Sequence, residues 1–145
     1  MRKQDHTGQT IADFGCGEGR LEVELKASGH TGKIWSFDVG KCADHVIQTD
    51  IADIDKPDAS VDTGVFCLSL MGVNFPEFLS EANRLLKPGA ILYIAEVLNR
   101  FTDVEAFINH VKKYSGFELV KKTKIGDYKT NVQETAPTAF YVMKF

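Results

Sequence analysis

The sequence predicts a single α/β domain in which helices pack against a mostly parallel sheet. The first observation behind this prediction is that short apolar segments, typical of buried strands, alternate with segments whose apolar residues recur at helical spacing. The second is the length of 145 residues, with 43% hydrophobic and 26% charged residues, which suits one domain with one core. In open sheets of this kind ligands bind beyond the carboxyl ends of the strands, so the site is expected there.

The first part of the chain contains three strand candidates and one helix candidate. Strands are predicted over residues 10–14 and 33–38, with a short third strand over 45–48. A helix is predicted from residue 20 to about residue 26. The six residues between the second and third strands are too few for a helical crossover. We therefore predict a loop crossover to a weak edge strand.

The second part continues the alternation. Residues 61–68 include a run that is apolar on both faces, as a central parallel strand requires. A helix is predicted from Phe75, and it is expected to end at Lys87-Pro88-Gly89. Thr102 and Glu105 form a capping box that opens a further helix. The remaining strands are predicted over residues 90–96, 117–123 and 139–145.

Composition excludes several classes of protein. The three cysteines form no C-x-x-C pair and the four histidines are scattered, so neither a disulfide framework nor a metal site is expected. There is no apolar run of about 18 residues and no apolar stretch behind the basic N-terminal pair, so we expect neither a membrane span nor a secretory signal. The formal net charge of -3 argues against a polyanionic partner for the chain as a whole, although residues 101–145 carry more basic than acidic residues. We expect a monomer.

A glycine-rich turn follows the first predicted strand. The segment Asp13-Phe14-Gly15-Cys16-Gly17-Glu18-Gly19 has the pattern D-x-G-x-G-x-G, and glycines at such a turn let the backbone approach a ligand closely. Glycines also punctuate any tight turn, so the pattern has a purely structural alternative. The dinucleotide-binding fingerprint requires a third glycine at the position of Arg20, which weakens the case for a nicotinamide cofactor.

Acidic residues follow the next two predicted strands. Asp38 ends the second strand, near the offset at which a carboxylate binds the ribose hydroxyls of a nucleoside cofactor, and Asp50 follows the third strand, where it can accept from an adenine amino group. Each could instead be a solvated loop acid. Asp13 and Glu18 would repel a pyrophosphate but would attract a cationic sulfonium and its amino group. The sequence therefore predicts S-adenosylmethionine as the cofactor.

The chain resembles the ribosomal RNA-processing protein 8 family, from about Ile11 to the C-terminus. The segments that carry the resemblance are Asp13-Phe14-Gly15-Cys16-Gly17, Phe37-Asp38, Phe66-Cys67-Leu68-Ser69-Leu70-Met71-Gly72 followed by Asn74, Glu81-Ala82-Asn83-Arg84-Leu85-Leu86-Lys87-Pro88-Gly89, and Ala95-Glu96-Val97 with Arg100-Phe101. The glycine turn and the Leu-Lys-Pro-Gly segment are shared by many methyltransferases. The segment that begins at Phe66 is more particular, and it decides the family.

The resemblance implies a Rossmann-like class I methyltransferase fold, with a mostly parallel seven-stranded sheet, an antiparallel last strand and helices on both faces. It implies methylation of N1 of an adenine in large-subunit ribosomal RNA, in the nucleolus, with ribosomal RNA or the pre-ribosome as partner and, in animal members, chromatin factors. Family members carry an upstream segment that closes over the cofactor. This chain begins nine residues before Thr10, so we expect residues 1–145 to be the methyltransferase domain without that lid.

Cofactor-binding residues are predicted from the motif and the resemblance together. The glycine turn would contact the cofactor, Asp38 its ribose, Asp50 and Ile51 its adenine, and Cys67 would lie near the methyl-bearing end. The full predicted set is Asp13, Gly15, Cys16, Gly17, Asp38, Asp50, Ile51 and Cys67. Cys67 is not expected to be a nucleophile, because a cysteine in an apolar strand usually behaves as a small hydrophobe.

Methylation of adenine N1 needs no general base, because the N1 lone pair can attack the sulfonium methyl group directly. Catalysis then reduces to in-line positioning of an unpaired or flipped base. The candidates to line the base pocket follow the last strands of the predicted site, and they are Ser69, Met71, Asn74, Glu96 and Arg100. Each has a structural alternative: Met71 as core, Asn74 as a helix cap, and Glu96 with Arg100 as an ion pair.

The sequence is also compatible with two other functions. A small-molecule methyltransferase would act without RNA, whereas a cofactor-binding chromatin or silencing module would bind the cofactor without turnover.

Overall fold

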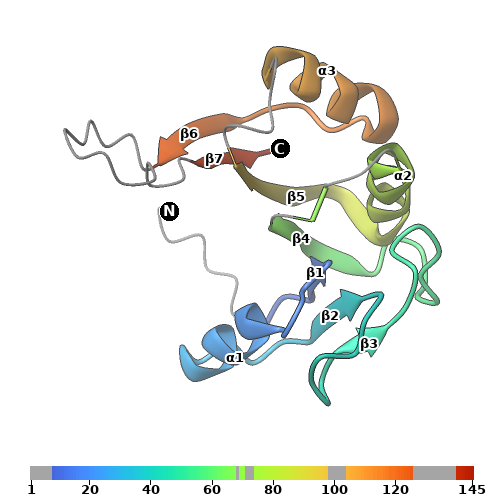
Figure 1. Cartoon of the computed structure of the whole chain (residues 1–145), viewed down its shortest axis with the longest axis vertical. Coiled ribbons are helices and arrows are strands. Elements are labelled where there is room, and N and C mark those ends of the chain that lie inside the picture. Colours follow the sequence, from blue (N-terminus) through green and yellow to red (C-terminus); the bar gives the residue numbers. More distant parts are fainter. Residues whose placement is uncertain (1–7, 68, 71–73, 98–103, 126–139) are drawn as a thin grey trace, which may run out of the picture.

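The computed structural model describes residues 8–67, 69–70, 74–97, 104–125 and 140–145, and the following account concerns these residues (Figure 1). One sheet contains seven strands in the order β3-β2-β1-β4-β5-β7-β6. The strands are β1 (Ile11–Phe14), β2 (Ile34–Asp38), β3 (Ile47–Gln48), β4 (Val61–Cys67), β5 (Leu86–Val97), β6 (Lys121–Ile125) and β7 (Phe140–Lys144). The helices are α1 (Arg20–Ala27), α2 (Phe75–Leu85) and α3 (Val104–Ser115).

The sheet is mixed, as predicted. β1 is parallel to β2 and β4, β2 is parallel to β3, and β4 is parallel to β5, whereas β7 is antiparallel to β5 and β6. The chain moves toward one edge through α1 and toward the other through α2 and α3, and right-handed crossovers in opposite directions place helices on opposite faces. Accordingly, α1 lies on one side of the sheet, and α2 and α3 lie together on the other (Figure 1). The crevice expected where the strand order reverses lies beyond the carboxyl ends of β1 and β4.

The hydrophobic core lies on the face covered by α2 and α3. Side chains alternate across a strand, so Phe14 points to this face and Asp13 to the face of α1. The ring of Phe14 stacks on those of Phe66 and Phe37, with ring centroids 4.8 and 6.0 Å apart, and all three rings are fully buried. The apolar residues of α2 close this core, whereas the one buried residue of α1 is the carboxylate Glu22. The α1 face is therefore the polar side of the sheet near the glycine turn.

The structure differs from the predicted elements at β5 and β6. α2 ends before Lys87-Pro88-Gly89, as predicted, but we expected the next strand to begin at residue 90, whereas β5 begins at Leu86 and runs through these residues. Leu86 pairs with Val61 before the register shifts at a bulge, and Gly89 adopts a positive φ of 78°. The bulge absorbs the irregular segment within a strand. β6 begins at Lys121 rather than at residue 117.

The predicted loop crossover to a weak edge strand is confirmed, because β3 has only two residues and occupies one edge of the sheet. The helix predicted after the capping box is present as α3, although Thr102 lies outside the described residues. Within the described part of the chain, no helix is long and apolar enough to cross a membrane. In the same residues, no cluster of three or more His, Cys, Asp and Glu side chains is placed to hold a metal ion.

Candidate functional site

A cavity of about 530 Å³ lies beyond the carboxyl ends of the central strands. It is lined by Gly15, Asp38, Val39, Asp50, Ile51, Ser69, Asn74 and Phe78. Six of these residues are predicted site residues, and they come from five separate segments of the chain. The fold thus brings four predicted cofactor residues into one cavity with two predicted base-pocket residues.

Two of the lining residues were not predicted. Val39 directly follows Asp38 and is 75% exposed. Phe78 lies on the apolar stripe of α2 and packs against the core cluster, so its spacing indicated a core residue. Only the docking of the helix brings the edge of the Phe78 side chain to the cavity.

β2, the strand beside β1, holds the glycine turn in place through hydrogen bonds. The amide groups of Gly15 and Cys16 both donate to the carbonyl oxygen of Phe37, each at 2.8 Å. The Asp38 carboxylate accepts from the amide of Gly17 at 2.8 Å and from that of Gly40 at 2.9 Å. Asp38 therefore fixes the turn while it lines the cavity. Each of its oxygens has a second lone pair with which to accept from a ligand.

Gly15 and Gly17 share one reason to be glycine, and Gly15 has a second. Their φ values are +72° and +58°, in the left-handed region that side chains rarely adopt. A Cβ on Gly15 would lie 2.5 Å from the Cβ of Ser69, whose hydroxyl donates to the carbonyl oxygen of Phe14 at 2.7 Å. A Cβ on Gly17 would meet no atom within 4 Å. A side chain at position 15 would therefore meet both an unfavourable backbone conformation and Ser69, which follows β4.

We expect Gly15→Ala to destabilise the fold more than Gly17→Ala. Gly17→Ala should cost about 1–2 kcal/mol for the left-handed backbone, and Gly15→Ala a further roughly 1–3 kcal/mol for the contact with Ser69. Urea unfolding of the two variants and the wild-type chain measures both effects. Equal losses in the two variants would show that Ser69 moves aside freely.

Acidic groups gather beneath the turn, and they raise the pKa of nearby side chains. Burial, together with the charges of Asp38 and Glu22, raises the pKa of Asp13 to about 6. Burial and the carboxylates of Asp13 and Asp38 raise the pKa of Cys16 to about 12, and partial burial with Asp13 and Glu96 also raises the pKa of Cys67. Both thiols are therefore protonated at neutral pH, which argues against a cysteine nucleophile.

The remaining cofactor predictions fall beside the cavity rather than on its lining. Asp13, Cys16, Gly17 and Cys67 are absent from the lining residues. Asp13 is 4% exposed on the α1 face, and Cys67 is exposed at the end of β4, not enclosed in the strand as the apolar pattern suggested. Cys67 extends one residue beyond the last paired residue of β1, Phe14, while its other neighbour β5 still pairs with it through Ala95. The acidic cluster acts on the cavity through its charge.

The predicted base-pocket residues are only partly described. Asn74 is the N-cap residue of α2, in agreement with its structural alternative, although its side chain makes no capping hydrogen bond. Glu96 is 2% exposed, and its Oε1 accepts from the amide of Leu70 at 3.0 Å. Its Oε2 has no hydrogen-bond partner in the described part of the structure. Met71 and Arg100 lie outside the described residues, so the predicted ion pair of Glu96 with Arg100 is not tested.

A polar network behind the glycine turn was missed by sequence reasoning. Glu22 on α1 accepts from Ser36 at 2.7 Å and from Lys26 at 2.6 Å. Burial alone would raise the pKa of Glu22, but these two hydrogen bonds and the nearby charges of Lys26 and His45 together outweigh it, and the pKa is lowered. The Nε2 atom of His45 lies 3.0 Å from the carbonyl oxygen of Gly19. Glu22 looks like an ordinary exposed helix residue in the sequence, because nothing local indicates its partner on β2.

Comparison with known proteins places the chain among methyltransferases. The family described as "Hypothetical methyltransferase" matches residues 1–134. The chain is 43% identical over 120 residues to ribosomal RNA-processing protein 8 of Dictyostelium discoideum, a match that covers 83% of the chain and 30% of that protein. It is 44% identical over 110 residues to the 25S rRNA (adenine(645)-N(1))-methyltransferase of Schizosaccharomyces pombe, which covers 74% of the chain and 34% of that protein. The chain thus spans about a third of the length of these relatives.

A solved structure agrees on the fold. The 1,6-didemethyltoxoflavin-N1-methyltransferase of Burkholderia thailandensis, with bound 1,6-didemethyltoxoflavin and S-adenosylhomocysteine, superposes with a TM-score of 0.71. The match covers 95% of the chain and 70% of that protein at 15% sequence identity. At this identity the likeness concerns the fold alone, which is the predicted Rossmann-like class I methyltransferase fold.

Proposed function

Because the chain belongs to the methyltransferase family that includes ribosomal RNA-processing protein 8, we propose that it binds S-adenosylmethionine and methylates N1 of an adenine in large-subunit ribosomal RNA. The observation that carries the proposal is the single cavity shared by the glycine turn, Asp38, Asp50 and two base-pocket candidates. Ribosomal RNA within the pre-ribosome is the proposed partner, and the nucleolus the proposed location, on the strength of the relatives' names.

The residues around the cavity fit this cofactor. The glycine turn offers an open backbone at Gly17, where a side chain would meet nothing, and Asp38 offers two carboxylate oxygens. The acidic group beneath the turn, Asp13 with Glu22, favours a cation and disfavours a pyrophosphate. A nucleoside that carries a positive charge matches both features. A dinucleotide does not.

Each lining residue has a proposed task. Asp38 accepts from the ribose hydroxyls, and Asp50 accepts from the adenine amino group. Ile51 and Phe78 supply apolar surface for the adenine ring, since both line the cavity. The ionised Asp13 attracts the amino group of the methionine part through its charge. When bound, the cofactor supplies a methyl group activated by its sulfonium.

Of the described base-pocket candidates, Ser69 and Asn74 line the cavity and Glu96 is not among its lining residues. N1 attacks through its own lone pair, so Ser69 and Asn74 need only orient the base by hydrogen bonds. The product base carries a positive charge, and the buried Glu96 carboxylate has one oxygen without a partner in the described structure. A buried carboxylate stabilises a charge that develops beside it. Arg100 belongs to this proposal through the resemblance alone.

The test of the proposal is methyl transfer to RNA. We expect the purified chain with S-adenosylmethionine to methylate large-subunit ribosomal RNA at an adenine, and thereby to create a stop for reverse transcriptase, because N1-methylation blocks Watson-Crick pairing. RNA incubated with S-adenosylhomocysteine in place of the methyl donor is the control.

Three other outcomes would each contradict part of the proposal. If the chain methylated a small metabolite in the absence of RNA, the proposed RNA substrate would be wrong. Cofactor binding without any transfer would favour the non-catalytic chromatin module. A failure to bind S-adenosylhomocysteine would contradict the cofactor itself.

A further inference from the structure

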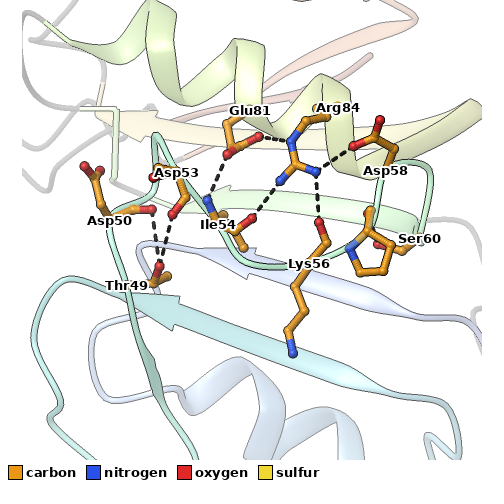
Figure 2. A network of polar contacts seen from close by, with 10 residues as sticks. Thr49, Asp50, Asp53, Ile54, Lys56, Asp58, Ser60, Glu81 and Arg84 are labelled. Atoms are coloured by element: carbon orange, nitrogen blue, oxygen red, sulfur yellow. Dashed lines mark hydrogen bonds and ion pairs between the residues drawn. The ribbon is translucent and has the colours of Figure 1, made fainter.

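Two charged residues of α2 hold the loop that follows β3 (Figure 2). Arg84 donates to the carbonyl oxygens of Ile54 and Lys56, at 2.7 and 2.8 Å, and to the carboxylate of Asp58 at 2.7 Å. The Nε of Arg84 donates to Oε1 of Glu81, one turn earlier on the same helix. Oε2 of Glu81 accepts from the amide of Ile54 at 2.8 Å. The pair therefore binds both polar groups of the residue Ile54, N–H and C=O.

Between Asp50 and Ile54, the residue bound by Glu81 and Arg84, the loop forms a tight turn with its own hydrogen bonds. The amide of Asp53 donates to the carbonyl oxygen of Asp50 at 3.0 Å, and the amide of Ala52 donates to the Asp50 carboxylate at 2.9 Å. Thr49 donates from its amide to the carbonyl oxygen of Asp38 at 2.9 Å. A displacement of Ile54 is therefore passed through a tight turn to Asp50, because few backbone torsions between them are free.

The same helix forms the opposite wall of the cavity. Phe78 of α2 and the preceding Asn74 line it on one side, and Asp50 with Ile51 lines it on another. The Glu81–Arg84 pair is the polar connection between these two walls. It joins the loop at Ile54 to α2, and Phe78 of this helix and the loop residues Asp50 and Ile51 line the space proposed for the adenine.

The side chains of Ile51 and Ile54 already anchor the loop in the core, where they are 6% and 3% exposed. Apolar packing is non-directional and fixes the depth of the loop. The forked guanidinium adds directional bonds to two carbonyl groups, which fix its register along α2. The register of the loop must be fixed if the carboxylate of Asp50 is to meet the amino group of the adenine.

From this geometry we infer that Glu81 and Arg84 are positioning residues for recognition of the cofactor's adenine. They do not touch the cofactor, and they act by holding Asp50 and Ile51 against α2. The inference rests on the proposed cofactor. It assigns to Glu81 and Arg84 the selectivity of the cofactor site for adenine.

The test compares two ligands that differ at the group Asp50 would recognise. S-adenosylhomocysteine carries the adenine amino group, and S-inosylhomocysteine carries an oxygen there. The affinities of both are measured by calorimetry for the wild-type chain and for Arg84→Lys, which keeps the charge beside Glu81 but cannot reach two carbonyl groups and Asp58 at once. We expect Arg84→Lys to bind S-adenosylhomocysteine about tenfold more weakly, as for one misplaced charged hydrogen bond. The preference over S-inosylhomocysteine should shrink.

Lys87→Gln is the matched control. It removes an ion pair of similar length, from Lys87 to Asp62 at 2.9 Å, at the start of β5 and away from the cavity. Both affinities should be unchanged in this variant. If Arg84→Lys keeps the wild-type preference for adenine, the inference is wrong, although the cofactor proposal stands. If the wild-type chain binds neither ligand, the cofactor proposal itself fails.

Hydrogen exchange decides the matter if Arg84→Lys does not fold. In the wild-type chain, S-adenosylhomocysteine should slow exchange of the Ile54 amide, which lies behind the cavity lining and is bound to Glu81. Ligand binding stabilises the whole fold, so a loop held only for stability predicts that the ligand slows exchange of the Ile54 amide no more than that of the Leu92 and Phe145 amides, which bond each other away from the cavity. That result would overturn the inference.

Discussion

Asp38→Ala is expected to weaken S-adenosylhomocysteine binding by a factor of roughly 10² to 10⁴. Two hydrogen bonds from ribose hydroxyls to a carboxylate are proposed at this position, and hydrogen bonds to charged groups contribute about 1.5–3 kcal/mol each. The same substitution removes the acceptor for the amides of Gly17 and Gly40, so the turn loses its support at the same time. Both losses act in the same direction. Calorimetric titration at constant salt measures the effect.

Two further variants separate these contributions. Asp44→Ala removes the same charge from an exposed position of the loop that follows β2, and its affinity should match the wild-type value. Asp38→Asn keeps the shape of the side chain but offers only one acceptor oxygen, so its affinity should be intermediate. An Asp38→Ala chain that remains folded and binds as tightly as the wild type would rule out the ribose contact.

The sequence was sufficient wherever the signal is local. The glycine turn, Asp38 at the end of its strand and Asp50 after the edge strand each follow from a few neighbouring residues, and the fold brings Gly15, Asp38 and Asp50 into one cavity. Parallel strands explain this success, because their carboxyl ends meet at one edge of the sheet. A residue placed just after such a strand is close to the site, whatever the details of packing.

The predictions failed or were silent where a partner lies far along the chain. The segment Lys87-Pro88-Gly89 has the composition of a turn, and only its pairing through Leu86 with Val61 shows that it belongs to a bulged strand. Arg84 and Glu81 look like an ordinary helical ion pair, since their acceptor and donor at Ile54 lie 27 or more residues earlier. Charged residues on a helix surface are usually solvated, so the segment that carries the family resemblance here did not indicate what these two residues bind.

Asp13 is expected to make stability depend on pH between about pH 4 and pH 6. Its pKa is raised by burial, by Asp38 and by Glu22, from the ordinary 3.8 to about 6. A carboxyl group whose pKa is raised on folding favours the folded state at low pH, where it is protonated in both states, and this advantage is lost as the pH rises from about 4 to about 6. The difference between the two pKa values corresponds to roughly 3 kcal/mol at neutral pH. Asp13→Asn should therefore raise the free energy of unfolding above pH 6 by up to about this amount.

Asp62 provides a control of opposite sign. Its pKa is lowered by hydrogen bonds from Lys87 and from the amide of Thr10, so its contribution to stability is present at neutral pH and is lost on acidification. Asp62→Asn should destabilise the chain at pH 7, whereas Asp13→Asn should stabilise it. Urea unfolding at pH 4, 5, 6 and 7 measures both variants. A neutral-pH loss of stability in Asp13→Asn would show that its carboxylate makes favourable contacts that outweigh the repulsion.

The same carboxylate should have the opposite effect on cofactor binding. The amino group of S-adenosylhomocysteine is a cation at these pH values, and it favours the ionised form of Asp13. Wild-type affinity should therefore fall as the pH drops below about 6, where Asp13 becomes protonated and binding must first release its proton. Asp13→Asn should bind more weakly at pH 7 and lose this pH dependence. Stronger folding with weaker binding in one variant would mean that the acidic cluster is retained for the ligand at the expense of stability.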